Sequence, residues 1–250
     1  MTDPQPTDPQ SAAASAAARL DLVEESTRRL LATVSGLEPG ALAEPSALPG
    51  WTRGHVLAHL ARNADSLVNL LTGARTGTDV PQYAGNEARD QGIERDAPRP
   101  LDVQLADLRD SHARFAEAAA LLDPRAWTAT VKHRHGYVFP ACDIPAKRLV
   151  ELEFHHVDLA AGYTPARWPR DFAVAQFHRV AEGLADETGL PGVELVAEDG
   201  GERATIGSGT PALTVTGPVH ALAAWLSGRS DGADLRRTPD TDLPRLPPMG

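Results

Sequence analysis

The chain has 250 residues, with 34 acidic side chains against 24 basic ones and a formal net charge of −10. Its length suits one large domain or two smaller ones, and its 42% hydrophobic and 23% charged residues are ordinary for a soluble globular protein. The acidic balance argues against nucleic-acid binding, because phosphate recognition needs a basic surface. The single cysteine, Cys142, excludes an internal disulfide and a cysteine-based zinc site.

The location of the protein follows from two features of the sequence. No apolar stretch approaches the roughly 18 residues that span a bilayer, and the polar N-terminus has no apolar signal-peptide core. We therefore expect a cytoplasmic protein that does not bind membranes. Nearly all basic residues are arginine, with lysine only at Lys132 and Lys147, and alanine is abundant. This bias is typical of a GC-rich genome.

The first two thirds of the chain carry the pattern of four long helices. Gly36 ends the first helix, Thr52 is a suitable N-cap for the second, and Pro145 stands where the fourth begins. Four long helices with one large excursion are typical of a four-helix bundle, which we assign to residues 12–168. The predicted segments are a disordered tail at 1–11, a helix ending at 35, a helix at 53–72, an irregular excursion at 73–100, a helix at 101–122, a hairpin or irregular crossover at 127–139, and a helix at 145–161.

The character of the sequence changes after Pro169. Short β-like runs lie between two helical segments, and a Pro-rich tail covers residues 239–250. This order predicts a small α+β domain over residues 169–238 and a mostly α fold for the whole chain. The expected elements are a helix at 170–187, strands at 193–196, 204–206 and 213–216, and a helix at 218–226.

Two predicted helices place histidine and carboxylate side chains at helical spacing. The second helix contains His55 and His59, and the fourth contains Glu151, His155 and Asp158. Residues i and i+4 lie on one helical face about 6 Å apart. At about 100° per residue, His59 lies nearer the apolar side than His55, and the three residues of the fourth helix share one strip.

Imidazole nitrogen and carboxylate oxygen are zinc ligands, and facing helices of a bundle can hold such a site. The helical geometry favours His59, Glu151 and His155 as three ligands. Solvated ion pairs or core histidines would explain the same spacing without a metal. Glu153 and His156 have the Glu-x-x-His spacing of di-iron bundles, but the second helix has no copy of this motif.

The run from Leu48 to Ala61, Leu-Pro-Gly-Trp-Thr-Arg-Gly-His-Val-Leu-Ala-His-Leu-Ala, closely resembles the N-terminal motif of the mycothiol-dependent maleylpyruvate isomerase family. That family belongs to the DinB-like metal-binding bundles. The run from Glu151 to Leu159 resembles its second motif. The order of the motifs, their separation and the small C-terminal domain extend the resemblance over about residues 20–235.

The resemblance places the family's metal ligands on His59, Glu151 and His155, and it implies a DinB-like four-helix bundle. His55 matches a family position that is not a ligand, so it is expected to support the site from outside or to cap its helix. Cys142 is expected to be structural or incidental. The family draws its thiol from the cosubstrate, and no histidine is obviously paired with this cysteine.

Anion-binding residues are expected from the same resemblance. Arg89 corresponds to an arginine in the excursion after the second helix, and Arg229 to one from the C-terminal domain. The planar fork of arginine suits the two oxygens of a carboxylate. Arg148 could line the same cavity and Asn63 could contact the ligand, with Asp65 a weaker candidate. Each of these arginines could instead be a surface residue.

The resemblance implies a zinc- and mycothiol-dependent isomerase that converts maleylpyruvate to fumarylpyruvate. Its partners would be a small acidic substrate and a low-molecular-weight thiol, and the chain would be a monomer or homodimer. An actinobacterial source would suit both mycothiol and the GC-rich composition. Two alternatives remain open: a mycothiol S-transferase acting on an electrophile, in detoxification or natural-product biosynthesis, and a non-enzymatic metal-binding module.

Overall fold

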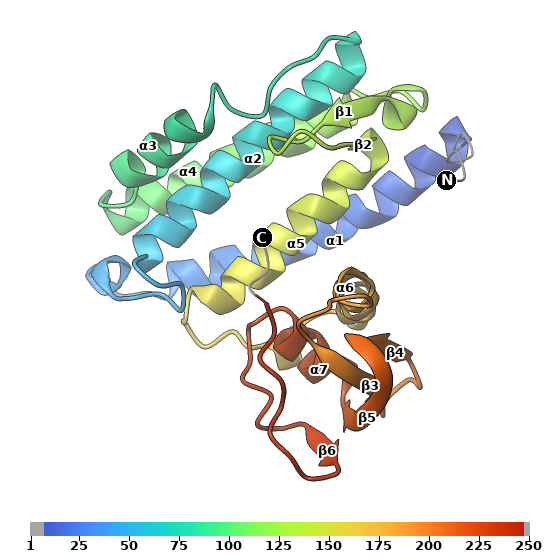
Figure 1. Cartoon of the computed structure of the whole chain (residues 1–250). Helices are drawn as coiled ribbons and strands as arrows, with labels where there is room; N and C mark the ends of the chain where they lie inside the picture. The colour runs from blue at the N-terminus through green and yellow to red at the C-terminus, as the bar shows by residue number, and fades with distance from the viewer. Residues whose placement is uncertain (1–7, 248–250) are drawn as a thin grey trace. The chain divides into compact units, whose positions relative to one another are not determined.

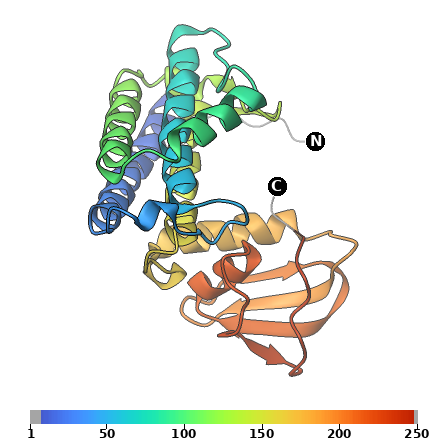
Figure 2. The same ribbon diagram turned by 90° about the vertical axis from the view of Figure 1, so that its left-hand side faces the viewer.

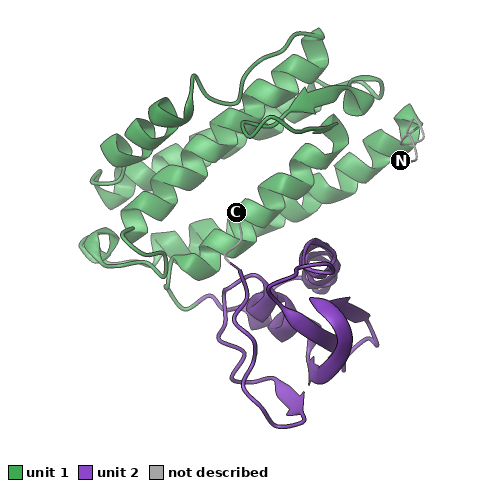
Figure 3. Ribbon diagram, viewed as in Figure 1, with its two compact units in different colours: residues 1–162 green, residues 163–250 purple. Residues whose placement is uncertain are grey.

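The structure, a computed structural model, describes residues 8–247. The chain forms two compact units, Met1–Gly162 and Tyr163–Gly250 (Figure 3). The mostly α fold expected from the sequence is confirmed, with a two-stranded sheet in the first unit and a four-stranded sheet in the second. No helix between residues 8 and 247 combines the length and apolar character needed to cross a membrane.

Four long helices build the first unit (Figures 1 and 2). Helix α2 packs against α4 and α5, and α1 packs against α5 and α4. Large buried side chains such as Leu30, Leu60, Phe115 and Leu152 fill the space between them. The elements of this unit are α1 (Pro9–Ser35), η1 (Ala41–Ala43), α2 (Arg53–Thr76), α3 (Asn86–Asp96), α4 (Leu101–Ala120), η2 (Ala126–Thr128), β1 (Thr130–Lys132), β2 (Val138–Pro140), η3 (Ala141–Asp143) and α5 (Ile144–Asp158).

Helix α1 begins inside the stretch predicted as a disordered tail. Pro9 occupies the first turn, where its missing N–H costs nothing, and the Asp8 carboxylate accepts a hydrogen bond from the Ser11 backbone N–H at 3.0 Å. This cap outweighs the polar composition that suggested disorder at residues 9–11. Residues 1–7 of the predicted tail lie outside the described residues.

The excursion after the second helix contains a helix that the sequence analysis missed. Helix α2 continues to Thr76, and α3 follows beside it (Figures 1 and 2). Only Ile93 gives α3 a large buried apolar side chain, so its pattern has no helical period. Instead the buried Asp96 carboxylate holds the end of α3, accepting hydrogen bonds from Arg62 at 2.8 Å and Arg95 at 2.8 Å.

The hairpin interpretation of residues 127–139 agrees with the pairing of β1 and β2. The two strands are antiparallel, with Thr130 opposite Pro140 and Lys132 opposite Val138. The loop between them contains His133 and Arg134. Helix α5 starts at Ile144 with Pro145 in its first turn, one residue before the predicted start, and ends at Asp158.

The second unit is a four-stranded sheet with strand order β4-β3-β5-β6, and two helices that pack on each other. β3 pairs antiparallel with β4 and parallel with β5, and β6 is an edge strand that the sequence analysis missed. Buried Leu195, Val215, Phe177 and Trp225 form its core. The elements are η4 (Pro165–Arg167), α6 (Arg170–Gly183), β3 (Pro191–Ala197), β4 (Arg203–Ile206), β5 (Ser208–Gly217), α7 (Val219–Leu226) and β6 (Arg236–Thr238).

Gly54 allows the chain after α3 to lie directly against the first turn of α2. A Cβ at Gly54 would collide with the carbonyl oxygen of Ala97 and would lie 3.2 Å from Nε2 of Gln104. That amide donates to the same Ala97 carbonyl at 2.8 Å, so the contact joins α2, α4 and the end of α3. Glycine at this position therefore sets the distance between α3 and the bundle.

Gly54→Ala should lower the free energy of unfolding by about 1–3 kcal/mol, because the added methyl forces backbone apart in a packed region. Gly40→Ala is the matched control, since a Cβ there meets nothing within 4 Å and φ is −81°. Urea unfolding of both variants measures the difference. Equal midpoints would mean that the α3 segment can move away from α2 at no cost.

Candidate metal centre

The first turn of α2 orients the histidines of that helix. The Thr52 hydroxyl and the His55 side chain form a capping box, in which His55 Nδ1 accepts from the Thr52 backbone N–H at 3.2 Å. His55 therefore caps the start of α2, which is one of the two roles expected for it from the sequence. His59, one turn later, is buried and faces α5.

Two imidazoles converge on one carboxylate oxygen between α2 and α5. Nε2 of His59 lies 2.9 Å from Oε2 of Glu151, and Nε2 of His155 lies 3.2 Å from the same oxygen. Two ligands about 2.1 Å from a tetrahedral ion are roughly 3.4 Å apart. Both distances to the carboxylate oxygen are close to that value, and the three ligand atoms all lie within 4.8 Å of one another. Within residues 8–247 only this trio of histidine, cysteine or acidic residues converges in this way.

The outer nitrogen of His155 is held by a carboxylate. Nδ1 of His155 lies 2.9 Å from Oδ2 of the buried Asp158, one turn along α5. A hydrogen bond from Nδ1–H to this carboxylate leaves Nε2 as the free lone pair and fixes the ring. This arrangement is the one by which proteins orient metal-binding histidines.

Arg89 approaches the outer nitrogen of His59. Its guanidinium lies 3.3 Å from Nδ1 of His59 and forms an ion pair with Asp90 at 2.7 Å. A neutral His59 that ligates through Nε2 carries its proton on Nδ1, so it cannot also accept a hydrogen bond there. Metal ligation through Nε2 of His59 and this Arg89 contact therefore exclude each other.

Burial and hydrogen bonding act in opposite directions on the three ligands. Burial lowers the pKa of His59 to about 4, which keeps its imidazole neutral. Burial alone would raise the pKa of Glu151, but hydrogen bonds from His155 and His59 hold it well below its usual value. Burial alone would lower the pKa of His155, but hydrogen bonds with Asp158 and Glu151 raise it above its usual value. A neutral imidazole and an ionised carboxylate are the forms that bind a cation, so a metal would displace a proton from His155.

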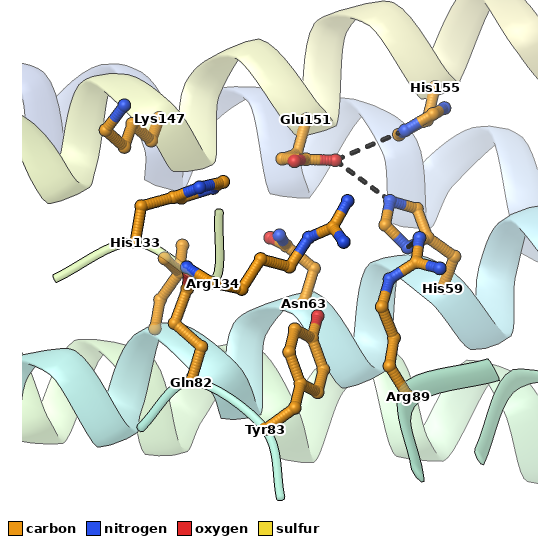
Figure 4. A pocket seen from close by; sticks show the side chains of 11 residues that line it. His59, Asn63, Gln82, Tyr83, Arg89, His133, Arg134, Lys147, Glu151 and His155 are labelled. Atoms are coloured by element: carbon orange, nitrogen blue, oxygen red, sulfur yellow. Dashed lines mark hydrogen bonds and ion pairs between the residues drawn. The ribbon is translucent and has the colours of Figure 1, made fainter. Parts of the chain in front are cut away.

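The trio lines one side of a pocket of about 210 Å³ (Figure 4). Asn63 and Arg89 line this pocket as well, as expected. Tyr83 reaches into it, and burial raises the pKa of its phenol, so the hydroxyl is a hydrogen-bond donor at neutral pH. The complete lining is His59, Asn63, Leu67, Gln82, Tyr83, Arg89, His133, Arg134, Lys147, Glu151 and His155.

Arg148 does not line the pocket, contrary to the expectation for it. Its side chain is 1% exposed, and it donates to the Leu60 carbonyl and to Oδ1 of Asn63, both at 2.8 Å. It points between α2 and α5 because these two acceptors belong to α2. Arg148 therefore positions Asn63 rather than a ligand.

Arg229, Asp65 and Cys142 were also singled out in the sequence. Arg229 follows α7 in the second unit, where it donates to the Ser227 carbonyl at 2.7 Å, and its substrate role stays a prediction. Asp65 is bonded to Arg114 at 2.7 Å. Cys142 is buried, and burial and Asp143 raise the pKa of its thiol, which argues against a nucleophile.

The Glu-x-x-His pair faces the opposite side of α5 from the trio. Glu153 accepts hydrogen bonds from Ser26 and from Arg29 of α1, and Nε2 of His156 lies 2.8 Å from the Thr33 hydroxyl. Both side chains are buried. They join α5 to α1, so this pair contributes to packing and does not converge with the pocket.

Sequence reasoning missed five polar side chains of the pocket. Lys147 could have been found, because it precedes Glu151 by four residues as Glu151 precedes His155, which places all three on one strip of α5. The others lie in irregular segments without a periodic signal. The missed residues are Gln82, Tyr83, His133, Arg134 and Lys147.

Comparison with known proteins bears on the same region. The family described as mycothiol maleylpyruvate isomerase N-terminal domain matches residues 23–160, which include all three ligands of the trio. The chain belongs to this family.

Two solved structures resemble the whole chain. They are the crystal structures of the mycothiol-dependent maleylpyruvate isomerase and of a histidine-to-alanine mutant. Each is 26% identical in sequence, with a TM-score of 0.87, and the match covers 94% of this chain and 97% of that chain. The maleylpyruvate isomerase fold expected from the sequence is thus confirmed. No curated protein matches the chain in sequence.

His59→Ala should abolish stoichiometric zinc binding in this member of the maleylpyruvate isomerase family, because only two ligands remain. His55→Ala should lose helix-cap stability of about 0.5–2 kcal/mol but keep the metal. Elemental analysis of the purified variants distinguishes them. If His55→Ala empties the site and His59→Ala does not, the trio is not the ligand set.

Asp158→Asn should weaken zinc affinity about 10- to 100-fold, because the amide no longer fixes the proton on Nδ1 of His155. Competition with a chelator of known affinity measures the change. Asp96→Asn is the control, since Asp96 is an equally buried carboxylate that accepts from Arg62 and Arg95 away from the trio. It should cost stability and leave zinc affinity unchanged. Equal zinc affinities in both variants would remove Asp158 from the site.

Proposed function

We propose that this protein is a zinc- and mycothiol-dependent cis–trans isomerase that converts maleylpyruvate to fumarylpyruvate. The observation that carries the proposal is the convergence of two imidazole nitrogens and one carboxylate oxygen in a pocket that also contains cationic side chains. The likeness to a mycothiol-dependent maleylpyruvate isomerase over nearly the whole chain supports the substrate and the thiol.

His59, Glu151 and His155 would hold the metal, and the two imidazoles with one carboxylate are a donor set that suits zinc. When bound, zinc would supply a further position at which a thiol is held as the thiolate, since a free thiol near pKa 8.5 is mostly protonated at neutral pH. Asp158 keeps the proton of His155 on Nδ1, as its 2.9 Å contact requires.

The isomerisation leaves the composition of the substrate and of the thiol unchanged. The thiol sulfur forms a bond to one carbon of the cis double bond, the π bond breaks, and its electron pair moves to the oxygen of the conjugated ketone. Rotation about the resulting single bond follows. Return of the electron pair then expels the thiolate and leaves the trans double bond.

The cations of the site act on the charge that develops during this reaction. Arg89 lines the pocket beside His59, where a guanidinium binds a substrate carboxylate and stabilises the enolate oxygen. We propose the same role for Arg229, and a contact of Asn63 with the thiol cosubstrate. Tyr83 adds a neutral hydrogen-bond donor from the same wall.

The test is activity on maleylpyruvate with zinc-loaded protein, in the presence and absence of mycothiol. Formation of fumarylpyruvate with the thiol returned in full supports the isomerase. Stoichiometric loss of thiol into an adduct would instead identify a mycothiol S-transferase. Tight zinc binding with neither result would identify a metal-binding module. A chelated, metal-free sample with undiminished activity contradicts the role of the trio.

Arg89→Ala should leave the zinc content unchanged and should lower kcat/KM for maleylpyruvate about ten- to a hundredfold, because a charge-assisted contact worth roughly 1.5–3 kcal/mol is lost. Arg89→Lys should restore only part of the rate, since an ammonium cannot form the bidentate contact. Steady-state kinetics on both variants give the answer. Wild-type rates for Arg89→Ala would exclude this residue from substrate binding.

A further inference from the structure

The end of the pocket nearest the β1–β2 hairpin is cationic. Lys147 lies on α5 one turn before Glu151, which is about 6 Å along the helix axis. His133 and Arg134 come from the hairpin loop, and Figure 4 shows Lys147 and His133 together at this end, with the Arg134 side chain extending over the middle of the pocket. The trio lies at the other end, where Glu151 and His155 share the strip of α5 that carries Lys147 and His59 comes from α2.

The cations at this end have no carboxylate partners, although the chain has ten more acidic than basic residues. Among residues 8–247, Arg134 donates to the side-chain oxygen of Asn86 at 3.2 Å and makes no ion pair. Lys147 likewise makes none in the described part of the chain. Arg62 and Arg114, which lie outside the pocket lining, are both bonded to aspartates.

Neutral groups hold the ammonium of Lys147 in place. Its Nζ donates to the Tyr137 hydroxyl at 3.1 Å and lies 4.3 Å from the centre of the Phe139 ring. Such contacts fix the position of a cation without neutralising its charge. The pKa of the neighbouring His133 is lowered to about 4. Burial is the main cause, and the positive charges of Lys147, His135 and Arg134 add to it.

We propose that Lys147 and Arg134 bind a second carboxylate of the substrate, at the end of the molecule away from the reacting double bond. This inference rests on the proposed function, because it uses the trio as the reacting end of the pocket. Maleylpyruvate has a carboxylate at each end of a seven-carbon chain. Arg89 then serves the reacting end, and the spacing of one helical turn between Lys147 and Glu151 selects acids with a distant second carboxylate.

The proposal is tested with heptanedioate, an unreactive seven-carbon diacid, and with heptanoate, which lacks the second carboxylate. Both are titrated calorimetrically into zinc-loaded wild type, Lys147→Met and Arg134→Gln. Lys132→Met is the control, because Lys132 is the other lysine of the chain and is exposed on β1. Thermal unfolding and zinc content of each variant report whether the fold and metal are intact.

We expect heptanedioate to bind wild type and the Lys132 variant alike, and to bind Lys147→Met about tenfold more weakly, with a smaller loss for the exposed Arg134. Heptanoate should bind weakly and equally to all four proteins. The proposal is overturned if heptanedioate does not bind wild type or binds equally to every variant. It is also overturned if Lys147→Met weakens the binding of heptanoate as much as the binding of heptanedioate.

Activity separates this inference from the proposed function. Thiol-dependent isomerisation with an unchanged KM for maleylpyruvate in Lys147→Met refutes the second carboxylate site and leaves the isomerase intact. Diacid binding that depends on Lys147, without any isomerisation, retains the acid-binding site and refutes the isomerase.

Discussion

The carboxylate of Glu151 reaches from α5 to α2 and joins the two helices through His59. A carboxylate removed from water needs compensating partners, and here both come from imidazoles, at 2.9 and 3.2 Å. The same three atoms that satisfy one another without an ion are positioned to bind one. The interface between α2 and α5 is therefore a candidate ligand set as well as a packing surface, and the placement of the pocket follows from it.

A second polar contact keeps this interface at a fixed spacing. Arg148 is buried between the same helices and spans them by donating to a backbone carbonyl and a side-chain oxygen of α2. Burial lowers the pKa of this guanidinium to about 10, so it stays charged at neutral pH. The nearby negative charge of Glu151 opposes that decrease. The anion and the cation thus stabilise each other's burial within one layer of the bundle.

The sequence predicted the three residues of the trio, which lie on regular helices. The apolar periodicity of α2 distinguished His59 from His55, and Thr52 was recognisable as the residue that starts the helix. Arg148 was misjudged, because a position adjacent to the ligand strip does not reveal whether a long side chain turns toward the pocket or toward the neighbouring helix.

Apolar periodicity could not predict helix α3 in the excursion, nor the side chains that the hairpin loop contributes to the pocket. Helix α3 is held by Asp96 and its arginines and by the contact at Gly54, and it buries only one large apolar residue, Ile93. Such contacts join residues far apart in the sequence and leave no local pattern. The positions of Arg89 and Arg134 depend on them, so family resemblance was the signal for Arg89, and no signal was available for Arg134.

The trio and most of the cationic residues of the pocket lie on elements that differ in how well they tolerate substitution. The trio belongs to core helices, where a substitution disturbs packing and a buried ionic contact together. Arg89 and Arg134 come from a short helix and a loop that contribute little to the core, whereas Lys147 lies on α5 with Glu151 and His155. Substitutions in those segments can accumulate without unfolding the bundle. Within such an architecture, descendants of one ancestor can diverge in the acids they accept while retaining the same inherited metal chemistry.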